Sequence, residues 1–136
     1  MNVPSSRSGM EKYKQASIQH GVEDATPHRL IQMLMDGVMM KIAAAKGHLV
    51  RMETNEKGAA ISMAISIIDG LRVSLDFETG GDLARNLDDL YDYMGRCLLQ
   101  ANLKNDAGKL DEVTALMGQI KSACYRIFFF SSCLSR

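Results

Sequence analysis

Apolar residues recur at three- and four-residue steps in four long stretches of this chain, and this periodicity constrains its fold more than any other feature. The stretches cover about 27–52, 57–76, 82–101 and 107–127. Such spacing places the apolar side chains on one face of a helix, whereas no stretch has the period-two alternation of a half-buried strand. Short connections separate the four stretches. The sequence therefore predicts an all-α, antiparallel up-down four-helix bundle in one domain.

Three local signals set the predicted helix boundaries. Thr26 precedes Pro27, which is the pattern of a hydroxyl N-cap followed by proline at the first helical position. Asp82 follows the Gly80-Gly81 pair and is the predicted N-cap of the third helix. No proline follows Pro27, so none interrupts the later helices.

The chain divides into three predicted parts. Residues 1–25 are polar with scattered apolar positions and are read as a mobile arm with room for one short helix. Residues 26–127 form the bundle. Residues 128–136, which contain Phe128–Phe130, are an atypical apolar tail that leaves the helical stripe. We hypothesise that this tail packs into an apolar groove of its own or a neighbouring molecule and so supports self-association.

Charge and hydropathy exclude several partners. Lys plus Arg and Asp plus Glu number 16 each, so the chain has no net basic surface for nucleic acid. No apolar run approaches the roughly 20 residues of a membrane span, and the N-terminus lacks the apolar core of a secretory signal. We expect a cytosolic protein that does not insert into membranes.

No residue pattern predicts catalysis, a metal site or a cofactor. The three cysteines and three histidines are widely spaced, and motifs of hydrolases, metalloenzymes and nucleotide-binding proteins are absent. Histidine phosphotransfer modules are also four-helix bundles. However, Lys46-Gly47 precede His48 here, whereas such modules place lysine and glycine after the histidine. The sequence therefore favours a binding protein over an enzyme.

Two helices carry a second apolar track outside the predicted core face. At 100° per residue, Met35 borders the core face of residues 27–52 and Met39 flanks it. Both tracks follow the spacing i, i+4, i+7, i+11. Their members are Met33, Gly37, Met40 and Ala44 in the first helix and Met63, Ile67, Gly70 and Ser74 in the second.

The second track has two interpretations. Small residues let another backbone approach and methionine adapts to varied apolar partners, so the track predicts a groove for an amphipathic helix. Met10, Tyr13 and Ile18 of the arm are then candidates for covering that groove when it has no partner. Alternatively, the two-sided helices are simply central in the bundle or form a homodimer interface.

Two blocks of sequence resemble the FliS family of flagellin-specific secretion chaperones. The first contains Tyr13-Lys14-Gln15 and continues from Thr26 to Leu34 with Asp36-Gly37. The second contains Ile68-Asp69-Gly70-Leu71, Ser74-Leu75-Asp76, Gly80-Gly81, Ala84, Asn86-Leu87, Leu90-Tyr91-Asp92-Tyr93-Met94, Leu98 and Ala101-Asn102. Together they extend over about residues 10 to 123.

The resemblance implies a cytosolic, non-enzymatic export chaperone with a helical bundle fold. Such a protein binds the disordered C-terminal segment of flagellin, prevents premature polymerisation and docks at the flagellar type III export gate. It also implies that the arm around Tyr13 regulates the groove. Two departures stand out, because Met35 replaces the family's usual tyrosine and no tryptophan lies near Cys124. The alternative is a self-associating structural bundle or adaptor without a flagellin client.

Overall fold

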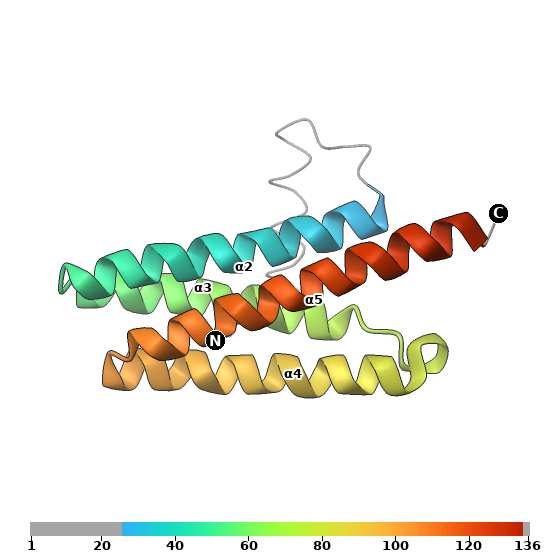
Figure 1. Ribbon diagram of the computed structural model, residues 1–136. Helices are drawn as coiled ribbons and strands as arrows, with labels where there is room; N and C mark the ends of the chain where they lie inside the picture. The colour runs from blue at the N-terminus through green and yellow to red at the C-terminus, as the bar shows by residue number, and fades with distance from the viewer. Residues whose placement is uncertain (1–25, 135–136) are drawn as a thin grey trace, which may run out of the picture.

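The computed structural model describes residues 26–134, with side chains described through Cys124. This part of the chain forms four helices, α2 (Pro27–Val50), α3 (Thr54–Val73), α4 (Phe77–Lys104) and α5 (Ala107–Leu134). Successive helices run in opposite directions (Figure 1). Each helix packs against two others, α2 against α3 and α5, and α4 against α3 and α5. The all-α prediction is confirmed, with no strand in the described range.

The first helix begins as predicted and ends slightly earlier. Thr26 Oγ1 accepts a hydrogen bond from the Arg29 backbone N–H at 3.1 Å, and Pro27 occupies the first turn. The helix ends at Val50 rather than near 52, because Met52 has a left-handed backbone with φ of 62°. α3 follows directly at Thr54, earlier than the predicted 57.

The structure starts α4 earlier than the predicted Asp82, with a kink at Gly81 directly before the predicted position. Asp76 is the N-cap, and its Oδ1 accepts from the backbone N–H groups of Glu78 and Thr79 at 3.1 Å each. The first turn of α4 then meets a kink at Gly81, where φ is 51° and ψ is −125°. Glycine adopts this conformation without a Cβ clash. Asp82 instead accepts a hydrogen bond from the Arg85 side chain.

The last helix continues to Leu134, beyond the predicted end near 127. No proline or glycine follows Gly118, so the sequence contains no residue that breaks a helix in this stretch. The backbone of 128–134 is therefore helical and continuous with α5. The hypothesis that Phe128–Phe130 pack into a groove concerns side chains outside the described ones.

One core joins the four helices. Its fully buried large side chains come from every helix and include Leu34, Ile61, Leu98 and Leu110. Met35, predicted at the edge of the core face, is fully buried. Leu83, at the start of the periodic stretch 82–101, is half exposed.

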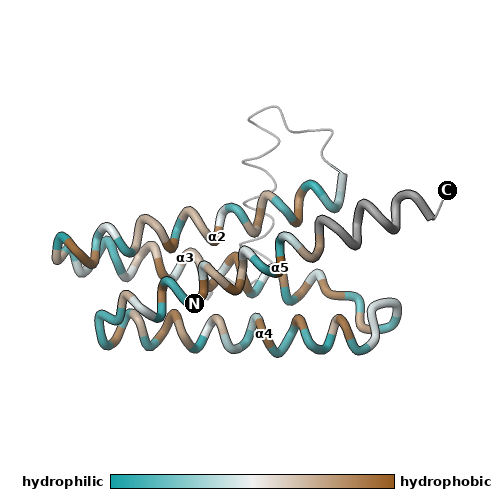
Figure 2. Tube along the Cα trace, in the orientation of Figure 1, coloured by the Kyte–Doolittle hydropathy of each residue, from teal (hydrophilic) through white to brown (hydrophobic). Residues whose placement is uncertain are grey.

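Polar contacts at the edges of the core tie neighbouring helices together. Hydrophobic and hydrophilic residues alternate along α4, seen as brown and teal segments of the tube (Figure 2). Arg72 of α3 donates to Asp88 of α4 at 2.8 Å. Lys46 of α2 donates to Asp111 of α5 at 2.7 Å, and Lys121 of α5 pairs with Asp36 of α2. These ion pairs identify which side of each helix faces which neighbour.

Candidate functional site

The predicted α2 track lies between the outward face of this helix and its α3 side. The α5 side of α2 is marked by Asp36, by Lys46 and by Met39, whose Cε lies near Gly118. At 100° per residue, the track residues point about 90° or more away from that side. Gly37 is buried, Met33 is half-buried, and Met40 and Ala44 are exposed.

The α3 track lies between the outward face of α3 and its α2 side. Arg72 and Lys57 mark the opposite, α4 side through their bonds to Asp88 and Asn102. Of the track residues, Ile67 and Gly70 are buried, whereas Met63 and Ser74 are exposed. The Ser74 hydroxyl donates to the Leu71 carbonyl at 2.7 Å. The two predicted tracks therefore lie beside each other on the outer surface where α2 and α3 meet, and we call this surface the furrow.

The large and small side chains of the two tracks alternate because a small residue of one helix lies at the same height along the hairpin as a large residue of the other. The turn centres on Met52, and residues at equal distances from it along the two helices lie at about the same level. Gly37 thus lies level with Ile67, and Met40 lies level with Ala64, next to Met63. A glycine beside a branched side chain lets two helices pack closely.

This arrangement corrects one part of the prediction. Ile67 belongs to the core cluster and is 5% exposed, so the α3 track is not wholly outside the core. A helical wheel gives the direction of each side chain around its own helix but not the position of the neighbouring helix. Here α2 packs against the side of α3 that carries Ile67. The role of the eight track residues in partner binding stays a prediction.

The outward part of the furrow presents exposed apolar side chains with few charges. Met40 is 71% exposed and Met63 is 50% exposed. Between Lys57 and Asp69 the α3 sequence contains no charged residue, and Ala59 and Ser62 there are exposed. A helix facing only water normally carries charged or polar groups along its outer face. The surface is therefore suited to an apolar partner.

Periodicity missed several exposed apolar residues at one end of the bundle. Val50 and Met52 lie at the end of α2, and Leu103 lies in the last turn of α4. Helix ends give no periodic signal beyond the last turn, so only the structure reveals this exposure. The predicted arm residues Met10, Tyr13 and Ile18 lie outside the described residues.

Residues 26–124 show no sign of a metal site or of a membrane span. No group of three His, Cys, Asp or Glu side chains there is arranged to hold a metal ion. No helix in the described part is long and apolar enough to cross a membrane. His48, considered for phosphotransfer, is half-buried with Nδ1 2.7 Å from Glu53 Oε1.

Comparison with known families identifies the class of protein. The family model described as "Flagellar protein FliS" matches residues 9–127, which include all the described side chains. The chain belongs to this family of flagellar secretion chaperones, and the family is not a class of enzymes.

Individual relatives give the same assignment across distant bacteria. The chain is 52% identical over 113 residues to the flagellar secretion chaperone FliSB of Pseudomonas aeruginosa, covering 83% of this chain and 90% of the relative. It is 47% identical over 121 residues to FliS of Salmonella typhimurium, covering 88% and 90%. It is 33% identical over 105 residues to FliS of Bacillus subtilis, covering 77% of each chain.

Proposed function

We propose that this protein binds the C-terminal segment of flagellin, prevents its premature polymerisation and keeps it competent for flagellar type III secretion. The observation that supports this most is the outer furrow of α2 and α3. There Met40 and Met63 are exposed beside a stretch of α3 that contains no charged residue. The relatives are named as secretion chaperones, which fits a surface made for an unfolded client.

The physical basis is coupled folding and binding. A disordered segment loses conformational entropy when it becomes helical, and burial of its apolar face must offset that loss. A furrow between two helices accepts the apolar face of a third helix along its whole length. Methionine side chains adjust to varied apolar partners, which suits a client contact that forms as the client folds.

One charged side chain on this surface could fix the orientation of the bound client. Lys41 is exposed on the α3 side of α2, and no ion pair among the described residues includes it. An acidic residue of the bound client placed over Lys41 would gain a charge-assisted contact, although an exposed pair contributes only about 0–1 kcal/mol. Apolar contact with Met40 and Met63 therefore supplies most of the proposed affinity.

Substitution of the two exposed methionines tests the proposal. Fluorescence anisotropy with a labelled flagellin C-terminal segment should show binding weakened about tenfold or more in Met40→Asp and Met63→Asp, because each buries a charge in an apolar contact. Val50→Asp is the matched control, since Val50 is 72% exposed on the same helix but faces away from the furrow. Unchanged affinity in both folded methionine variants would contradict the proposal.

Self-association through the same furrow is the alternative. It predicts a stable dimer without any client, which Met63→Asp would dissociate in sedimentation experiments at increasing concentration. The export proposal instead predicts a complex of one chaperone with one client segment, whose helicity rises on mixing. In that proposal, docking at the export gate and covering of the furrow are roles of the arm containing Met10, Tyr13 and Ile18.

A further inference from the structure

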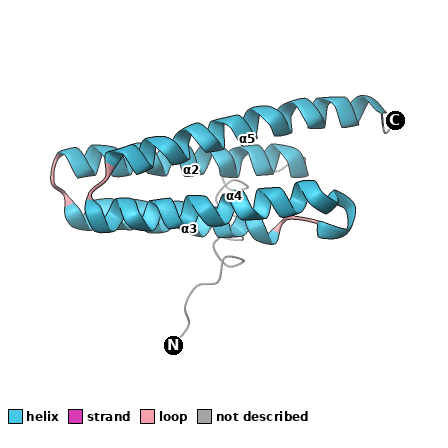
Figure 3. Cartoon of the chain, turned by 60° about the horizontal axis from the view of Figure 1, so that its bottom comes forward, coloured by secondary structure: helices cyan, strands magenta, loops and turns pink. Residues whose placement is uncertain are grey.

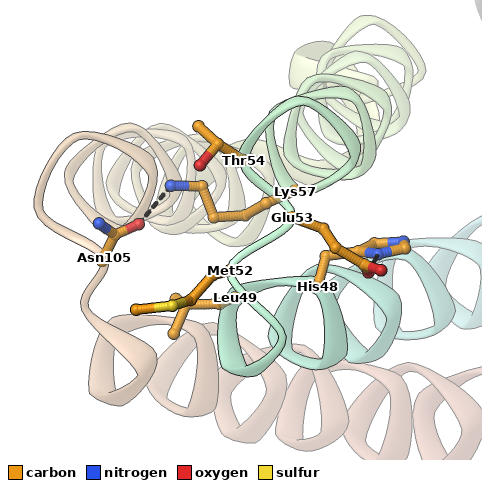
Figure 4. Close-up of a pocket in the computed structure, with 7 residues that line it drawn as sticks. All are labelled: His48, Leu49, Met52, Glu53, Thr54, Lys57 and Asn105. Carbon is orange, nitrogen blue, oxygen red and sulfur yellow. Dashed lines mark hydrogen bonds and ion pairs between the residues drawn. The ribbon is translucent and has the colours of Figure 1, made fainter.

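The α2–α3 and α4–α5 connections lie at the same end of the bundle (Figure 3). A cavity at this end is lined by residues from both connections. Its volume is about 340 Å³, and its walls come from the end of α2, the start of α3 and the residue after α4. Leu49 and Met52 form its apolar side, and Thr54, Lys57 and Asn105 lie opposite (Figure 4). It is separate from the exposed methionines of the furrow, which line none of it.

Lys57 is the one charged residue buried among the described side chains, with 3% exposure. Its Nζ donates to the Asn102 carbonyl oxygen at 3.0 Å and to Asn105 Oδ1. No ion pair among the described residues includes it, so no carboxylate there neutralises the ammonium. The C-terminal end of the α4 dipole compensates only part of the charge. Of three N–H donors, one lacks an acceptor in this part of the chain.

The nearest carboxylate of the cavity is already engaged. Glu53 Oε1 accepts from His48 Nδ1 at 2.7 Å and from Arg51 Nε at 2.9 Å. These hydrogen bonds, first that of His48 and then that of Arg51, lower the pKa of Glu53 and keep it ionised. Arg51 balances this carboxylate, so the positive charge of Lys57 remains available to an incoming group.

The rim of the cavity is apolar and conformationally unusual. Met52 is 88% exposed although it has a positive φ of 62°, a conformation that non-glycine residues rarely adopt. Val50 and Leu103 are also exposed at this end of the bundle, but they line none of the cavity. This conformation of Met52 ends α2, where the Glu53 N–H donates to the His48 carbonyl oxygen at 2.8 Å, and it leaves the Met52 side chain exposed beside the cavity. The geometry therefore presents a methionine beside a buried cation.

We propose that this cavity binds a carboxylate side chain carried on an apolar segment of a protein partner. The carboxylate accepts from the free N–H of Lys57, and an adjoining aliphatic side chain of the partner packs on Met52 and Leu49. A charge-assisted hydrogen bond to a buried ammonium is stronger than one formed in water. The cavity thus gives the chaperone a second contact, at a distance from the client furrow.

Peptide titrations monitored by NMR test this proposal on the full chain. The probe is acetyl-Leu-Asp-Leu-amide, and the matched control peptide replaces Asp by Asn. We expect saturable shifts of the backbone amides of residues 48–57 and of Asn105 with the Asp peptide. Binding of the Asn peptide should be about tenfold weaker, since it loses the charge-assisted contact. Equal affinity for both peptides, or shifts centred elsewhere, would overturn the proposal.

Two variants separate binding from stability. Lys57→Met should weaken binding of the Asp peptide about tenfold and remove the preference for Asp over Asn. Because this change also removes a contact to α4, Met52→Gly provides a second variant in which glycine suits the observed φ and the fold is retained. It should weaken both peptides equally, whereas Met40→Ser in the furrow should change neither. Full binding by Met52→Gly would contradict the proposed apolar contact.

Discussion

The kink of α4 at Gly81 can be tested by making the same substitution at two glycines of this helix. At Gly81 and at Gly95 an added Cβ would meet no atom within 4 Å outside its own chain neighbourhood. Space is therefore equal at the two sites. Gly81 has φ of 51° and ψ of −125°, whereas Gly95 lies in regular helix. The substitutions Gly81→Ala and Gly95→Ala thus differ chiefly in backbone conformation.

The two changes should have opposite effects on the free energy of unfolding. An alanine forced into the conformation of Gly81 costs about 1–3 kcal/mol. At Gly95, alanine reduces the entropy of the unfolded chain and should stabilise by about 0.5–1 kcal/mol. For a chain of this length, 1 kcal/mol corresponds to roughly 4 °C in Tm. We expect Tm to fall by about 4–12 °C in the first variant and to rise by about 2–4 °C in the second.

Urea unfolding followed by far-ultraviolet circular dichroism measures both variants against the wild type. The slope of the transition should stay constant, so that the shift in midpoint reports stability. A neutral or stabilising effect of Gly81→Ala would show that the kink is not a fixed feature of α4. A shift of both variants in the same direction would refute the assignment of the effect to backbone conformation.

Three further predictions concern a cap, the core and a thiol. Hydrogen bonds from the Thr79 and Glu78 N–H groups lower the pKa of Asp76. The cap therefore stabilises the fold above the ordinary pKa of a carboxylate, and this stabilisation is lost as pH falls. Asp76→Ala should lower Tm at neutral pH, and the Tm difference between variant and wild type should shrink in acid. Leu98→Ala removes a fully buried side chain and should reduce the free energy of unfolding by about 2–5 kcal/mol in the same urea assay. Burial raises the pKa of the Cys124 thiol, so mass spectrometry should find Cys124 alkylated at pH 8 more slowly than a cysteine in an unfolded control peptide; equal rates would contradict this.

The sequence predicted the helices better than their ends. Thr26-Pro27 combines two independent signals for one start, and the structure has the expected cap there. For the third helix, the Gly80-Gly81 pair led to Asp82 as the predicted N-cap, whereas the structure has the cap at Asp76. Because glycine tolerates the kink at position 81, one turn of helix forms before it. A kink of this kind leaves no periodic signal in the sequence.

The residues of the candidate furrow could be predicted from the sequence, but their position relative to the neighbouring helix could not. Spacing identified Gly37 and Ile67 as members of a second track. Only packing shows that they lie level with each other at the edge of the α2–α3 contact, with Ile67 in the core. Lys57 could not be predicted as a buried cation, because lysine usually extends its charged end into water. Its acceptors come from the distant end of α4.

Photo-crosslinking tests the central proposal most directly. A photoreactive residue in place of Met40 or Met63 would be irradiated with flagellin bound, with the same residue in place of Val50 as the control. Mass spectrometry then maps the crosslinked peptides. The account predicts crosslinks from Met40 and Met63 to the C-terminal segment of flagellin and none from Val50. Crosslinks from Val50 alone, or to another part of flagellin, would contradict it.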